Sequence, residues 1–238
     1  MAAAYALPMV RVFAVYEAKF LILRKSVMAD KLIVISMTNK RLEKLANNLL
    51  TSLRRLNIPI SMHNIYLPGA EYGSSEFQEV VMHKIRIVCD ALSAGHHVLW
   101  TDVDIAFRRD PRQDLLDRLS DYDVVFQQST ERDLCSGFFA VKPSPASLEF
   151  FDKDVLIAMR SPKYLGDEKR IRRRFRENPN MVKLGYLPID LYPSGWHQQN
   201  LTLREHRFIT HYNYRRKTSE KIAAMKACGD WFLDCETS

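Results

Sequence analysis

The sequence is short of glycine and cysteine, with 8 and 4 among its 238 residues. No glycine-rich loop follows the first predicted strand, where the chain reads Thr38-Asn39-Lys40-Arg41. The cysteines are scattered and lack the close paired spacing of a zinc site. They are also too few for a disulfide framework in a chain of this length. We therefore expect reduced thiols and a cytoplasmic protein.

A long apolar run is also missing. Residues 1–27 lean apolar, but charged side chains interrupt them at Arg11, Glu17, Lys19, Arg24 and Lys25. A membrane span needs about 20 consecutive, mostly apolar residues, and a secretory signal needs a cleaner central run. We expect neither. Residues 1–30 are instead predicted to form a helical extension that packs on the domain, with peripheral contact to a membrane as the alternative.

Apolar residues and basic charge are plentiful. Hydrophobic residues make up 47% of the chain, which is enough for the core of one large domain over residues 31–238. The 35 basic and 28 acidic residues give a net charge of +7. Such a charge suits an anionic partner, such as a nucleotide diphosphate, a nucleic acid or an acidic membrane surface, without choosing among them.

Predicted strands and helices alternate along the chain, which indicates the α/β class. Residues 32–37 form a β-branched apolar run, and leucines at spacings of three and four then predict a helix over residues 42–56. Asn48 and Thr51 fall on the polar face of that helix. A second helical pattern over residues 77–91 stops at Gly95. Further on, a helix is predicted within residues 153–176 in two pieces, broken near residue 161, and a terminal helix over residues 222–233.

The most informative stretch runs from His97 to Phe107, where an apolar strand leads into Asp102 and Asp104. In an open α/β sheet the carboxyl ends of the strands face the ligand crevice. Hard divalent cations take oxygen ligands, so two carboxylates at this position suit Mg²⁺ or Mn²⁺. A solvated turn is the competing interpretation of a bare Asp-x-Asp. Because neighbouring carboxylates repel, we expect Asp104→Asn to leave the metal-free protein as stable as the parent or slightly more stable.

One basic run, from Arg170 to Arg176, offers a second kind of site. It has the charge density of a nucleic-acid contact. The interpretation we favour is a solvated helix face with Ile171 and Phe175 turned inward.

Several motifs occur in an order that is typical of one family. They are Val98 to Asp104 with Arg109-Asp110-Pro111, Ser136 to Val141, Leu187-Pro188 followed by Tyr192 to Gly195, and His211 to Tyr214 with Lys221 to Met225 behind them. On these motifs the chain resembles the nucleotide-diphospho-sugar transferases of the GT-A fold, most closely glycosyltransferase family 77. The resemblance covers roughly residues 30 to 233. It implies a central, mostly parallel mixed sheet flanked by helices.

The resemblance also implies a set of site residues. Mn²⁺ or Mg²⁺ would be held by Asp102, Asp104 and His211. Catalytic roles fall to Asp167 and Lys84. The nucleotide-sugar contacts would be Thr38, Asn39, Lys84, Asp102, Ser136, Gly137 and Lys221. Four of these residues have a structural alternative: N-capping for Thr38 and Asn39, a β-bulge for Gly137, and a hydrogen-bonded structural role for His211.

Three positions depart from the family pattern. Cys135 stands where Asn is usual, Glu168 replaces Gln, and Lys217 replaces Gly. The first departure weakens any inference about the choice of sugar. The third puts close backbone approach to a diphosphate in doubt, and Lys221 is our choice for the phosphate contact.

The expected function is transfer of a sugar from a nucleoside diphosphate sugar, most simply a UDP-sugar, to a hydroxyl of a glycan or glycoprotein, with retention of configuration. Two alternatives stay open. A sugar-nucleotide pyrophosphorylase normally carries a glycine-rich basic loop after its first strand, which this chain lacks. A non-enzymatic protein that binds RNA or a membrane would not need the Asp-x-Asp. We expect no nucleic-acid partner.

Overall fold

A computed structural model describes residues 32–65, 75–130, 133–159, 166–200 and 205–235. The helical extension predicted for residues 1–30 lies outside these ranges. None of the helices within them is long and apolar enough to span a bilayer.

A six-stranded mixed sheet forms the centre of the fold, in the order β2-β1-β3-β6-β5-β7. Its strands are β1 (Leu32–Thr38), β2 (Ile60–Asn64), β3 (His97–Thr101), β5 (Val124–Gln128), β6 (Leu134–Val141) and β7 (Leu184–Tyr186). Strand β6 is antiparallel to both of its neighbours, β3 and β5, whereas β1 pairs in parallel with β2 and β3, and β5 with β7. The prediction of a mostly parallel mixed sheet is therefore confirmed.

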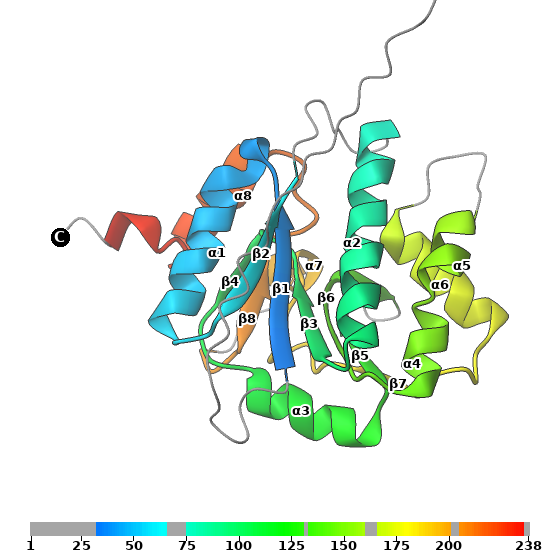
Figure 1. The fold of residues 1–238 in the computed structure, drawn as a ribbon. Helices are drawn as coiled ribbons and strands as arrows, with labels where there is room; N and C mark the ends of the chain where they lie inside the picture. The colour runs from blue at the N-terminus through cyan, green and yellow to red at the C-terminus, as the bar shows by residue number, and fades with distance from the viewer. Residues whose placement is uncertain (1–31, 66–74, 131–132, 160–165, 201–204, 236–238) are drawn as a thin grey trace, which may run out of the picture.

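Helices cover both faces of this sheet (Figure 1). One side carries α1 (Glu43–Arg55) and α8 (Thr218–Ala227); the other carries α2 (Ser75–Ser93), α4 (Pro145–Phe150), α5 (Lys153–Ala158) and α6 (Asp167–Glu177). Helix α3 (Arg112–Asp121) runs across one end of the sheet, and α7 (Gly195–Asn200) is a short helix near the strand β8 (Ile209–His211). Each face has its own apolar core: Leu45, Leu49 and Leu53 of α1 belong to one, and Val81, Ile85 and Val88 of α2 to the other.

The C-terminal segment corrects two predictions. Asn48, assigned to the polar face of α1, is fully buried, and its side chain donates to Asp230 O at 2.9 Å and accepts from Phe232 N at 2.7 Å. The chain after α8 therefore covers a face of α1 that the sequence pattern marks as solvated, and Thr51 is buried there as well. The predicted terminal helix is also too long, because α8 ends at Ala227 and Gly229 follows with a φ of +66°.

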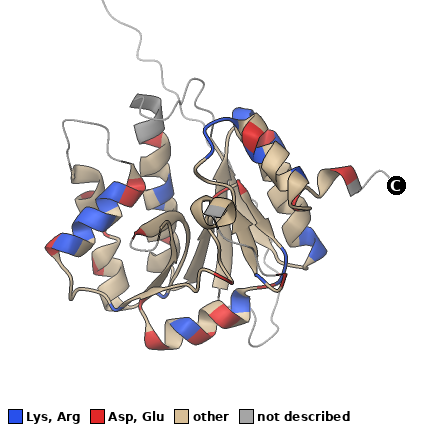
Figure 2. Cartoon of the chain, turned by 180° about the vertical axis from the view of Figure 1, so that it is seen from behind, with Lys and Arg blue, Asp and Glu red and all other residues tan. Residues whose placement is uncertain are grey.

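Charged side chains are spread over several helices, with acids among the bases (Figure 2). On α6, Arg172 pairs with Asp133 and Glu168 at 2.9 Å each, and Arg173 pairs with Glu177 at 2.7 Å. The preferred interpretation of this run as a solvated helix face holds for these two arginines. It is wrong for Arg170, which is buried and donates to three main-chain carbonyl oxygens of α5 and its end.

A second, two-stranded sheet brings the site together. Just after β3, the strand β4 (Ile105–Phe107) pairs antiparallel with β8 (Ile209–His211), and Ile105 lies opposite His211 in the register. Tyr212 N also donates to Asp104 O at 2.9 Å. This pairing fixes His211 beside the Asp-x-Asp segment, although about a hundred residues separate them in the chain.

Candidate active site

One cavity, of about 420 Å³, is lined by all ten of the predicted site residues. They are Thr38, Asn39, Lys84, Asp102, Asp104, Ser136, Gly137, Asp167, His211 and Lys221. The cavity lies at the carboxyl ends of β1 and β3, where an α/β sheet is expected to bind its ligand. Its volume is within the range of small-molecule sites.

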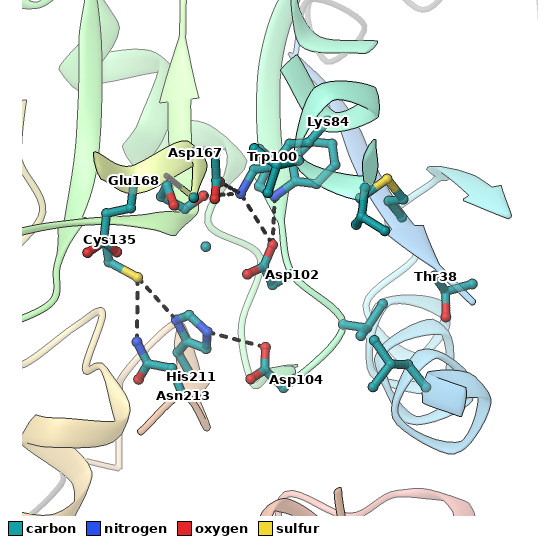
Figure 3. Close-up of a pocket in the computed structure, with 18 of the residues that line it drawn as sticks. Thr38, Lys84, Trp100, Asp102, Asp104, Cys135, Asp167, Glu168, His211 and Asn213 are labelled. Atoms are coloured by element: carbon teal, nitrogen blue, oxygen red, sulfur yellow. Dashed lines mark hydrogen bonds and ion pairs between the residues drawn. The ribbon is translucent and has the colours of Figure 1, made fainter. Parts of the chain in front are cut away.

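Asp102, Asp104 and His211 form the part of the cavity that can hold a cation (Figure 3). Each offers one ligand atom, and these atoms lie within 4.8 Å of one another. His211 Nε2 is 3.2 Å from Asp104 Oδ1. Two carboxylates and one imidazole are a donor set that suits Mn²⁺, and less well Mg²⁺. The residues present therefore fit the expected metal.

The charges around Asp104 do not fit the expectation that repulsion from Asp102 dominates its environment. Lys221 Nζ lies 2.5 Å from Asp104 Oδ2, so two cationic partners meet this carboxylate. Burial would raise the pKa of Asp104, but Lys221 and His211 hold it well below its usual value. Burial lowers the pKa of His211, yet the charge of Asp104 outweighs this and raises it to about 10. Repulsion between the two aspartates is thus not the dominant effect on Asp104.

Asp102 is in a different environment. Burial raises its pKa; Lys84 opposes this shift and the charge of Asp104 adds to it. Its Oδ1 accepts from Trp100 Nε1 at 2.8 Å. Trp100 is therefore a site residue that the sequence did not single out, although it stands two residues before the aspartate. The hydrogen bond orients the carboxylate within the cavity.

Lys84 lies between two aspartates of the cavity, Asp102 and Asp167. Its Nζ is 2.6 Å from Asp167 Oδ2 and 3.5 Å from Asp102 Oδ1, and it donates to Ser136 O at 2.6 Å. The ammonium also lies 4.8 Å from the centre of the Trp100 ring. Burial lowers the pKa of Lys84, but the two aspartates outweigh it and raise the value. The lysine thus stays charged inside the cavity.

Asn39 and Gly137 line the cavity and also have the structural roles considered as alternatives, N-cap and bulge glycine. Asn39 is the N-cap of η2 (Lys40–Leu42), since its side chain accepts from the backbone N–H groups of Arg41 and Leu42. Gly137 lies where the β5–β6 register shifts, as a bulge glycine would. A Cβ at Gly137 would collide with the imidazole of His211 and lie 2.8 Å from Asp102 Oδ2. Glycine is therefore required here for the ligand side chains to approach the backbone.

Two further polar residues contact the site and were missed: Gln127, which is buried, and Asn213, which is half-buried. Gln127 accepts from the His211 ring on the side away from Asp104, at 2.7 Å. Asn213 lines the cavity, accepts from Gly195 N at 2.6 Å and lies 3.5 Å from Cys135 Sγ. The one sequence signal for Gln127 is its position directly after the apolar run Val124–Phe126 of a predicted strand.

A family model for nucleotide-diphospho-sugar transferases matches residues 29–225. The chain belongs to this family. Among curated proteins, this chain is 29% identical to a UDP-galactose:fucoside alpha-3-galactosyltransferase of Dictyostelium discoideum, over 61% of this chain and 26% of that protein. It is 23% identical to the beta-arabinofuranosyltransferase RAY1 of Arabidopsis thaliana, over 74% of this chain and 38% of that protein. The chain thus spans well under half the length of these two relatives.

Solved structures agree on the fold. The chain aligns with the glycosyltransferase GlyE of Streptococcus pneumoniae with a TM-score of 0.58 and 13% identity, over 82% of this chain and 59% of that one. A glycosyltransferase involved in glycosylation of the major capsid of PBCV-1 also gives 0.58, with 10% identity, over 82% of this chain and 98% of that one. The chain therefore has the GT-A fold that its motifs indicate.

Proposed function

We propose that this chain is a metal-dependent glycosyltransferase that moves a sugar from a UDP-sugar to a hydroxyl of a glycan or glycoprotein, with retention of configuration. The observation that carries the proposal is the Asp102, Asp104 and His211 cluster in the cavity that also holds Lys84 and Lys221. A cation site flanked by two ammonium groups suits a diphosphate. Family membership makes a nucleotide-sugar donor the natural diphosphate.

Asp102, Asp104 and His211 would hold the cation, which would supply positive charge opposite the diphosphate leaving group. Lys221 adds a positive charge on the Asp104 side, and Lys84 adds one on the Asp102 side. Both ammonium groups are already in place, so they stabilise developing charge with little rearrangement. Thr38 and Asn39 line the end of the cavity nearest β1, and we assign them to the nucleoside.

Asp167 is the group we assign to the acceptor side. Burial would raise its pKa, but Lys84 lowers it below its usual value, so the carboxylate stays ionised. An ionised carboxylate in the cavity can orient an acceptor hydroxyl or stabilise the positive charge that develops on the sugar ring. The Ser136 side chain hydrogen-bonds to Asp167, and Ser136 O accepts from Lys84 Nζ. Glu168 lines the same part of the cavity.

The choice of UDP-sugar and of retention is supported by one relative. The Dictyostelium protein is described as using UDP-galactose and forming an alpha-3 linkage. The Arabidopsis protein is described as a beta-arabinofuranosyltransferase, so relatives of this chain differ in the sugar they transfer. We therefore leave the sugar itself to experiment.

A screen of nucleotide sugars with Mn²⁺, scored by release of nucleoside diphosphate, tests the proposal. One UDP-sugar should be hydrolysed slowly even without an acceptor, because water can replace the acceptor in an open site. Excess EDTA should abolish the release, and Mn²⁺ should restore it better than Ca²⁺ does. Turnover of a proven donor in excess chelator would show that the metal assignment is wrong. NMR of the first-formed product should show the donor's configuration, and the opposite anomer would exclude retention.

A further inference from the structure

Gln127 contacts His211 at Nδ1, the ring nitrogen that does not face Asp104. Both side chains are buried, Gln127 completely. The amide nitrogen of Gln127 lies 3.1 Å from Tyr192 O and 3.0 Å from Pro193 O, and its oxygen lies 2.7 Å from His211 Nδ1. Carbonyl oxygens only accept hydrogen bonds, so the amide nitrogen must face them and Oε1 must face the imidazole. The orientation of the glutamine is thereby fixed by its own partners.

An acceptor at Nδ1 determines how the ring is protonated. Nδ1 must carry a hydrogen to donate to Gln127 Oε1, so the neutral ring has its lone pair on Nε2. Nε2 is the atom that faces Asp104, at 3.2 Å, and belongs to the cation cluster. Cys135 Sγ is also 3.7 Å from Nδ1, but a thiol is a weak acceptor and this contact is longer. Gln127 therefore decides which nitrogen is free to bind a cation.

The strand pairing explains why Gln127 points toward His211. Phe126 pairs with Phe139 and Gln127 pairs with Cys135, so the register shifts between Phe126 and Gln127. A bulge redirects side chains locally and is common beside active sites. The same irregularity contains Gly137, which gives His211 and Asp102 the room they occupy. One interruption of the ladder thus makes space for the imidazole and also brings its hydrogen-bond acceptor to it.

We propose that Gln127 is a positioning residue, which sets the tautomer and ring orientation of His211 and thereby the cation affinity of the Asp102, Asp104 and His211 cluster. This inference rests on the metal dependence in the proposed function. Hydrogen-bond partners behind metal-binding histidines generally contribute about 10- to 100-fold to metal affinity. Gln127 touches neither the cavity nor the proposed donor, so its effect has to act through His211.

Mn²⁺ binding without any donor gives a readout that is separate from activity. The free Mn²⁺ signal in electron paramagnetic resonance would be titrated with the parent, with Gln127→Leu and with Gln128→Leu. Gln128 is a matched control, because its amide donates to Leu187 O at 3.2 Å from the same strand and does not touch His211. We expect Gln127→Leu to bind Mn²⁺ about 10- to 100-fold more weakly. Gln128→Leu should stay within about twofold of the parent.

Gln127→Glu keeps the test decisive if Gln127→Leu does not fold. A neutral glutamate at this position still presents an oxygen to Nδ1, and its O–H can donate to a main-chain carbonyl as the amide does. Its Mn²⁺ affinity should be within about threefold of the parent's. Parent-like affinity in a folded Gln127→Leu, or a loss in Gln127→Glu as large as the loss expected for leucine, would overturn the role of Gln127. If the parent itself binds no Mn²⁺, the metal dependence fails and this inference fails with it.

Discussion

Lys84 of α2 and Asp167 at the start of α6 form a buried ion pair, with Nζ and Oδ2 2.6 Å apart. The two side chains are 8% and 16% exposed. Lys84 also lies 3.5 Å from Asp102 Oδ1, so one ammonium balances two carboxylates that come from different elements. A buried pair of this kind is strongly destabilised when a single partner is removed, because the other charge is left uncompensated.

Lys84→Met should therefore destabilise the protein by about 3–5 kcal/mol and remove transfer activity. The double variant Lys84→Met/Asp167→Asn should recover part of that stability, because the second change removes one of the uncompensated charges. It should recover no activity, since both proposed roles are lost. Urea unfolding and release of nucleoside diphosphate measure the two effects. If the loss of stability in the double variant equals the sum of the losses in Lys84→Met and Asp167→Asn alone, the two side chains are not coupled.

Asp104→Asn tests the corrected view of the second aspartate. Because Lys221 and His211 stabilise its ionised form, this variant should melt at a lower temperature than the parent in EDTA. Saturation with Mn²⁺ and UDP at a hundredfold excess should stabilise the parent by about 2.7 kcal/mol. The variant should lose that increment as well. Thermal melts in EDTA and in Mn²⁺-UDP separate the two effects, and an intact increment in the variant would exclude Asp104 as a metal ligand.

His211 gives the metal-free protein a defined dependence on pH. Its pKa of about 10 in the folded chain lies above its ordinary value of 6.5. The stabilisation from the His211–Asp104 pair is therefore fully present below pH 6.5 and is lost as the pH rises toward 10. A cation must displace the proton on Nε2, so Mn²⁺ affinity should rise about tenfold per pH unit between pH 6.5 and 8.5. Calorimetry in buffers of different ionisation enthalpy should detect about one proton released per Mn²⁺. A pH-independent affinity would exclude His211 as a ligand.

Local patterns were sufficient to predict much of this site. Asp102 and Asp104 follow a buried strand, so their place at the carboxyl edge follows from the apolar run before them. Lys84 is a cation among apolar helical positions, where a charge is costly unless it meets an anion or reaches solvent. In both cases the residue's own neighbours in the sequence contain the information.

The missed features depend on partners that are distant in the sequence. Asn48 is polar in a helix with an apolar stripe, and its acceptor, Asp230 O, lies 182 positions away. Asp104 is stabilised by Lys221, which is 117 positions away, so repulsion from Asp102 was the only interaction the local sequence showed. Gln127 reaches His211 through a register shift that alternation along one strand does not reveal. Tertiary packing decides these contacts, whereas local sequence decides the secondary structure that brings them together.

At Gly137 the site has no room for a side chain. Gly137→Ala would force its new Cβ against the His211 ring and within 2.8 Å of Asp102 Oδ2, so the two ligands must move apart. We expect Mn²⁺ affinity to fall by tenfold or more, since a metal site tolerates only small displacements of its ligands. Gly166→Ala is the matched control, because Gly166 lines the same cavity but has no atom within 4 Å of the added Cβ and a φ of −62°. It should bind Mn²⁺ like the parent. Equal Mn²⁺ affinity in both variants would mean that Gly137 is only a bulge glycine and that the spacing of Asp102 and His211 does not limit the site.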